Sequence, residues 1–278
     1  MSTVTFFAIF AFLFGLLIGS FLNVVIARLP EDRSIVYPGS HCPECGADIR
    51  PHDNIPVISW LILGGKCRDC KTPISSLYPT VELLTGILAW LWFRHTFQTP
   101  ADLENPGKIA AFFVYFFFIA ALIAESYIDI RHYIIPDQLS IYAVPFAVLA
   151  MFLLHHLGYH SISWKVSVLG AFFGGGLLGF VALSWWVIRR TEGMGLGDIK
   201  LLAFIGAMFG PWPALFFVLV ISSLLATLVV LLGLFWGRGF RMALPYGPFL
   251  ALASIIWLFH GYVIADYWLP GWELLFPM

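Results

Sequence analysis

Charged residues are scarce in this sequence. Asp, Glu, Lys and Arg make up 11% of its 278 residues, whereas hydrophobic residues make up 60%. Soluble globular chains average about a quarter charged residues and less than half apolar ones. A bilayer core takes about 20 apolar residues per helix, and the chain has several uncharged runs of that kind. The composition therefore excludes an ordinary soluble domain and predicts an all-α polytopic membrane protein embedded in a lipid bilayer.

An excess of positive charge is also lacking. The formal net charge is −1, so we expect no nucleic-acid partner, since such proteins carry a basic patch or stripe. The first 27 residues contain no charged side chain and so lack the basic start of a cleaved signal peptide. We expect this segment to be retained as the first span.

Eight apolar segments are candidate transmembrane helices. The sixth is far shorter than about 20 residues and is followed by Gly210-Pro211-Trp212-Pro213, which favours a short tilted helix or a re-entrant segment. The candidates are residues 5–27, 77–93, 109–128, 139–154, 166–188, 199–209, 213–236 and 246–264.

The distribution of Lys and Arg predicts the orientation of these spans. With eight spans, 12 of the 15 basic residues fall on one side and 3 on the other. The positive-inside rule then places the segment 28–78 in the cytoplasm and both termini outside. If the sixth segment did not span, Arg238 and Arg241 would move outside and the bias would weaken.

All four cysteines of the chain lie in one polar loop. They form two C-x2-C pairs separated by 21 residues, Cys42 with Cys45 and Cys67 with Cys70. Such pairs can place four thiolates around one tetrahedral Zn²⁺, which we expect to be structural because four cysteine ligands leave no position for water. Two disulfides are an alternative that a reducing cytoplasm disfavours, and a redox or iron site is another.

Two aspartates lie at the predicted cytoplasmic boundary of the membrane. Asp129 ends the third candidate span, and Asp198 opens the sixth after Gly195 and Gly197. Ionisable groups at such positions are functional candidates. Two close carboxylates share a proton, so one can take a proton from water while the other polarises a peptide carbonyl. This arrangement predicts aspartic-protease chemistry.

The two aspartates are not expected to be equivalent. The helix dipole favours charge on Asp198, which suggests Asp198 as the base and Asp129 as the acid. Simpler roles remain open: a helix N-cap for Asp198, a solvated boundary charge for Asp129, and a turn residue for Asp137. Glu125 lies one turn before Asp129 on the same helix face, where it can tune Asp129, contact substrate or serve packing.

Together these blocks resemble the bacterial type IV prepilin peptidases. They include GSFLNVVIARLP at 19–30, the paired cysteines, Tyr78-Pro79, Asp129 with IPD at 135–137, and the GLGDIK motif at 195–200, which contains Lys200. The motif PYGP at 245–248 also looks like the family. The blocks occur in order over nearly the whole chain.

The resemblance implies an enzyme with two activities. It would cut the leader from prepilins or type II secretion pseudopilins on the cytoplasmic side of the bacterial inner membrane, using Asp129 and Asp198. It would then methylate the new N-terminal residue with S-adenosylmethionine. The implied domains are a first transmembrane helix at 1–28, a four-cysteine zinc loop at 29–78 associated with methylation, a second helix and outer loop at 79–108, and a peptidase domain at 109–278.

The sequence contains no recognisable motif for a methyl-donor site, since it lacks the glycine fingerprint of a Rossmann fold. Polar residues of the loop and its flanking helix are the candidates, namely Asp53, Asn54 and Glu82. The alternatives are a peptidase that does not methylate, a transporter or channel in which the aspartates bind a proton or cation, and a non-catalytic platform for secretion.

Overall fold

The computed structural model describes residues 2–159, 162–190, 195–236 and 244–268. This part of the chain is helical and has no β-strand beyond two isolated bridges, which confirms the predicted all-α class. The chain divides into two compact units, residues 1–124 and 125–278. The boundary falls within helix α4 (Pro106–His132), whose C-terminal residues belong to the second unit.

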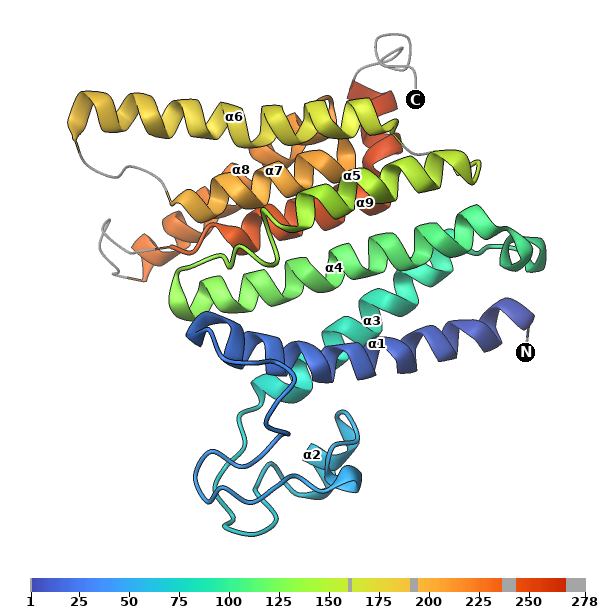
Figure 1. Ribbon diagram of the computed structural model, residues 1–278, viewed down its shortest axis with the longest axis vertical. Coiled ribbons are helices and arrows are strands. Elements are labelled where there is room, and N and C mark those ends of the chain that lie inside the picture. The colour runs from blue at the N-terminus through green and yellow to red at the C-terminus, as the bar shows by residue number, and fades with distance from the viewer. Residues whose placement is uncertain (1, 160–161, 191–194, 237–243, 269–278) are drawn as a thin grey trace. The chain divides into compact units, whose positions relative to one another are not determined.

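The first unit is built on the pairing of α1 (Thr3–Arg28) with α3 (Leu77–Thr96) (Figure 1). Glycines let the two helices approach closely. A Cβ on Gly15 would lie 2.6 Å from the Cβ of Ala89, and one on Gly19 would lie 2.7 Å from the Cα of Glu82. Any larger residue at these positions would force the helices apart.

The polar loop between α1 and α3 contains the short elements η1 (Leu29–Glu31), η2 (Pro51–Asp53) and α2 (Ile58–Ile62). Arg28 ties the end of α1 to this loop, because its guanidinium donates to the carbonyl oxygens of Ser34, Pro38 and Gly39 at 2.7 to 3.1 Å. A further 3-10 helix, η3 (Pro100–Glu104), connects α3 to α4. We call residues 29–76 the cysteine loop.

The second unit contains α5 (Ala143–His156), α6 (Trp164–Arg189), α7 (Leu196–Phe209), α8 (Ala214–Phe235) and α9 (Gly247–Trp268). Helix α7 is its core, since residues 201–208 are all buried. A Cβ on Gly170 of α6 would lie 1.9 Å from the carbonyl oxygen of Gly206 in α7. The two backbones are therefore in direct contact, and this packing fixes the position of α7, which begins at the site described below.

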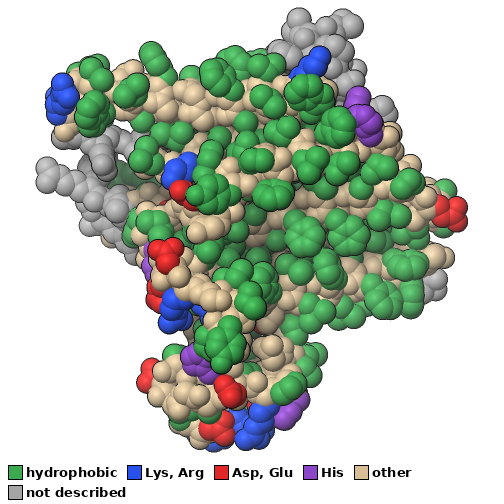
Figure 2. Space-filling view, viewed as in Figure 1, with side chains coloured by type: hydrophobic (Ala, Val, Ile, Leu, Met, Phe, Trp, Pro, Cys, Tyr) green, Lys and Arg blue, Asp and Glu red, His purple; other side chains and the backbone are tan. Residues whose placement is uncertain are grey.

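The membrane character of the chain appears in its long apolar helices. Each of the eight predicted segments forms a helix, but among the described residues only α1, α4, α6 and α8 are long and apolar enough to cross a membrane by themselves. The predicted count of eight spans is therefore not confirmed. Figure 2 shows hydrophobic side chains covering the visible helix surfaces. Arg238 and Arg241, used in the orientation argument, lie outside the described residues.

Candidate functional site

The four cysteines form one cluster in the cysteine loop. All four are free, their sulfur atoms lie within 4.8 Å of one another, and the Sγ atoms of Cys42 and Cys70 are 3.8 Å apart. Four thiolates bound to one Zn²⁺ at about 2.3 Å would have sulfurs about 3.8 Å apart. The donor set and its spacing therefore fit a tetrahedral metal ion, and the sulfurs are not paired as disulfides.

Each cysteine pair is held by the same backbone turn. The amides of Cys42 and Cys67 donate to the carbonyls of Ala47 and Thr72, five residues later, at 2.9 Å. The residue after each pair, Gly46 or Lys71, donates back to the first cysteine and has a φ of +70° or +62°. A positive φ is readily adopted by glycine but is uncommon for a residue with a side chain such as Lys71. The cluster is thus made of two equivalent turns that face each other.

Electrostatics within the cluster differ from one thiol to the next. The hydroxyl and the amide of Thr72 hydrogen bond to Cys70 and lower the pKa of its thiol to about 6. The pKa of Cys45 rises to about 11, because the lowering effect of the Ala47 amide is outweighed by burial and by the other three thiols. Four crowded thiols cannot all ionise without a cation, and a bound metal would supply the compensating charge.

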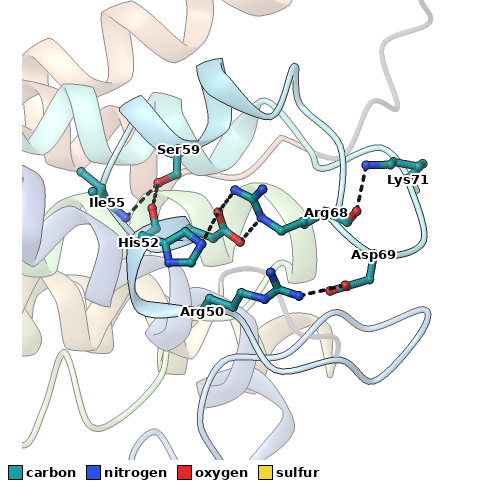
Figure 3. Close-up of polar contacts among 8 residues, drawn as sticks. Arg50, His52, Ile55, Ser59, Arg68, Asp69 and Lys71 are labelled. Atoms are coloured by element: carbon teal, nitrogen blue, oxygen red, sulfur yellow. Dashed lines mark hydrogen bonds and ion pairs between the residues drawn. The ribbon is translucent and has the colours of Figure 1, made fainter.

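The predicted methyl-donor residues have partners within the chain. Both carboxylate oxygens of Asp53 accept hydrogen bonds from the guanidinium of Arg68, one of them at 2.7 Å, and these bonds lower the pKa of Asp53. Figure 3 shows Arg68 reaching across the loop beside His52. Buried Glu82 accepts a 2.7 Å hydrogen bond from the amide of Val57, whereas Asn54 is exposed. In this structure, Asp53 and Glu82 hold the loop together.

The structure brings Asp129 and Asp198 together in the second unit. Asp129 lies in the last turn of α4 and is 6% exposed, and half-buried Asp198 lies in the first turn of α7. The two carboxyl groups are close enough to interact electrostatically. The backbone amide of Gly247, the first residue of α9, donates to Oδ2 of Asp129 at 2.8 Å. Sequence reasoning noted the 245–248 motif but missed this contact.

Glycine permits the close approach of α7 to the segment that follows α4. A Cβ on Gly197 would lie 3.0 Å from the Cβ of Ile135, and one on Gly195 would lie 3.4 Å from Oδ2 of Asp198. Gly193, which begins the glycine-rich run, lies outside the described residues.

An ion pair links the two sequence blocks that carry the aspartates. Nζ of Lys200, in the first turns of α7, donates to Oδ1 of Asp137 in the segment after α4. The sequence predicts a turn residue at Asp137, and the structure adds this ion pair. Opposite charges in the two blocks were visible in the sequence, but nothing in the sequence showed that they meet.

Glu125 is a third carboxyl group near the pair. Its side chain is fully buried, one helical turn before Asp129, and interacts with it electrostatically. Neither carboxylate oxygen has a hydrogen-bond partner within the described residues. Such a group is costly to bury in its ionised form.

Comparison with known proteins agrees with these features. Residues 13–96 match the Bacterial Peptidase A24 N-terminal domain, and residues 116–231 match the Type IV leader peptidase family. No solved structure gives a significant match.

Curated relatives share the name "Prepilin leader peptidase/N-methyltransferase". The one from Pseudomonas aeruginosa is 36% identical, with 92% of this chain and 91% of the relative covered. The one from Aeromonas hydrophila is 37% identical over 94% and 93%. A relative from Myxococcus xanthus is 38% identical over 81% of this chain and 63% of its own length. The chain therefore belongs to the type IV leader peptidase family.

Proposed function

We propose that this chain cleaves the leader peptide of type IV prepilins or type II secretion pseudopilins and methylates the new N-terminus. The observation that carries the peptidase activity is the pairing of Asp129 and Asp198, with Gly195 and Gly197 leaving room for close approach. The names of the relatives support the same pair of activities. They do not favour the transporter alternative.

The pair would work as one unit that shares a proton. The ionised carboxylate takes a proton from water, and the water oxygen bonds to the scissile carbonyl carbon. The protonated carboxyl group donates its proton to the carbonyl oxygen. Collapse of the tetrahedral intermediate then breaks the carbon–nitrogen bond, and the leaving amine takes up a proton.

Two features of the structure favour a negative charge on the pair, one on each aspartate. Asp198 lies at the N-terminus of α7, where the helix dipole favours a negative charge. The Gly247 amide, however, donates to Asp129 and favours charge there. We therefore assign the proton to the pair and not to one member.

The cysteine loop would hold one structural Zn²⁺ through Cys42, Cys45, Cys67 and Cys70. The ion would supply no chemistry to the peptide; it would cross-link two turns in a loop with little hydrophobic core. S-adenosylmethionine would serve as the methyl donor. The carboxylates of Asp53 and Glu82 are engaged by Arg68 and Val57, so they do not fit as free ligands of that cofactor.

The chain would act as a multi-pass protein of the bacterial inner membrane, with the aspartate pair and the cysteine loop on the cytoplasmic side. The bias of Lys and Arg supports this orientation. The domain limits expected from the sequence, 1–28, 29–78, 79–108 and 109–278, remain part of the proposal. Substrate prepilins and the lipid bilayer are the proposed partners.

Mass spectrometry of a prepilin N-terminus would test the two activities separately. The purified full-length chain is incubated with prepilin, with and without S-adenosylmethionine. We expect leader loss in both samples and one added methyl group only with the cofactor. Leader loss without methylation would leave a peptidase alone. An intact leader, with a known peptidase cleaving the same prepilin, would contradict the proposal.

A further inference from the structure

Helix α2 of the cysteine loop exposes an apolar face. Ile58, Leu61 and Ile62 are 53%, 64% and 76% exposed, and Ile55, just before the helix, is 47% exposed. Residues three and four apart lie on the same side of a helical segment, so these side chains form one patch. Elsewhere in the same loop, Val36 and Tyr37 are also strongly exposed, at 85% and 79%. We call Ile55, Ile58, Leu61 and Ile62 the α2 patch.

The start of α2 is fixed beside the apolar helices, not beyond their ends. The amide of Val57 donates to Oε2 of Glu82, which is the sixth residue of α3. Glu82 packs against Gly19 of α1, and α1 continues for nine residues from Gly19 to Arg28. At 1.5 Å per residue, this contact lies about 13 Å before the end of α1.

Helix α2, which carries the patch, lies on one side of the cysteine loop. In Figure 1, α2 lies on the side of the cysteine loop that is turned toward the N-terminal end of α1. The indole of Trp60, within α2, donates to the carbonyl of Ile74 at 3.1 Å and fixes the helix to the loop. The residues after Glu82 on α3, Leu83 and Leu84, are themselves 42% and 37% exposed. Exposed apolar side chains of α3 therefore lie next to the point where α2 is attached.

We propose that the α2 patch inserts into the boundary between headgroups and acyl chains of the phospholipid bilayer. An apolar helix face at this depth would otherwise be in contact with water, and apolar side chains at the interface are stabilised by burial among the acyl chains. The contact anchors the cysteine loop against the membrane at a third point, in addition to its two ends at Arg28 and Leu77. It goes beyond the proposed enzymatic activities and does not depend on them.

Photo-crosslinking in nanodiscs would test this contact. The photoreactive residue p-benzoylphenylalanine replaces Leu61 in the full-length chain, which is reconstituted in phosphatidylethanolamine and phosphatidylglycerol. The control places the same residue at Arg50, which lies in the same loop with a side chain 54% exposed (Figure 3). After irradiation, intact-mass spectrometry should show a protein–lipid adduct at Leu61 that is at least about ten times more abundant than at Arg50.

A second probe at Ile62 guards against local misfolding at one position. Lipid adducts from either probe, with little adduct from Arg50, would support the proposal. Three results would overturn it: no lipid adduct from monodisperse protein at both positions, equal adducts at Arg50, or cross-links from Leu61 and Ile62 to a second copy of the chain in place of lipid.

Discussion

Oδ2 of Asp129 accepts a 2.8 Å hydrogen bond from the backbone amide of Gly247, 118 residues later in the chain. The end of α4 and the start of α9 therefore meet at one carboxylate, beside Asp198 at the start of α7. A Cβ on residue 247 would lie 2.9 Å from the same oxygen. Glycine at this position allows a backbone donor to reach the proposed catalytic pair without a side chain in the way.

Replacing Gly247 with alanine should impair cleavage by displacing Asp129. A displacement of about 1 Å in a catalytic group can cost on the order of 100-fold in rate, so we expect a loss of leader cleavage between about 10- and 100-fold. Gly176→Ala is the matched control, since a Cβ there meets nothing within 4 Å. Cleavage by Gly247→Ala equal to that by Gly176→Ala would show that the contact does not position Asp129.

The Lys200–Asp137 pair should matter more for cleavage than for stability. Its side chains are 33% and 44% exposed, so the pair contributes less than about 1 kcal/mol to folding. It nevertheless joins the two blocks that carry the aspartates. We expect Lys200→Met and Asp137→Asn each to lower cleavage several-fold with little change in Tm.

A double-mutant cycle measures this coupling. Lys200→Asp combined with Asp137→Lys should recover part of the activity that each single change removes. If the fold-loss of activity in the double variant equals the product of the two single losses, the pair does not position the site.

Loss of one cysteine should remove the metal from the loop. We expect about one zinc per chain in the native protein by elemental analysis, and strongly reduced zinc in Cys45→Ser, because three thiolates bind less tightly than four. The loop of this variant should be cut sooner by a protease, while the Asp129–Asp198 unit should retain leader cleavage. Native protein that is active, metal-free and disulfide-bonded would contradict the zinc assignment.

The Asp53–Arg68 contact gives the loop a defined pH dependence. The hydrogen bonds from Arg68 hold the pKa of Asp53 below its ordinary value. A lowered folded-state pKa stabilises the fold above the unfolded pKa of about 3.9, and this contribution is lost as the pH falls through the folded value. Asp53→Asn should therefore speed proteolysis of the loop by a factor that stays constant between about pH 8 and 9, well above both pKa values of Asp53. A factor that varies within this range would assign the effect to another group.

The sequence predicted those features that depend on spacing along the chain. The two C-x2-C pairs indicated one metal cluster, and the apolar runs indicated helices at 5–27 and 109–128, where α1 and α4 are found. The contacts that support the aspartates could not be predicted from the sequence. The Gly247 amide and the Lys200–Asp137 pair bring together segments more than 60 residues apart, and such pairings depend on how the helices pack.

The methyl-donor candidates show a second limit of prediction from sequence. Asp53 and Glu82 are polar residues in a suggestive region, yet the structure engages one with Arg68 and the other with the Val57 amide. Residue type alone did not distinguish a ligand from a structural hydrogen-bond acceptor. The apolar residues of α2 were likewise visible in the sequence, but only their exposure and their attachment to Glu82 point to the membrane.

Leader cleavage by Asp129→Asn and by Asp198→Asn, measured on a prepilin with the full-length protein in the same detergent, tests the central claim most directly. Asparagine keeps the size of the side chain but cannot take or give the shared proton. The account predicts that both variants insert and purify like the native chain and that each loses cleavage by at least about 1,000-fold. Near-native cleavage by either variant would contradict the assignment of that residue to the catalytic pair.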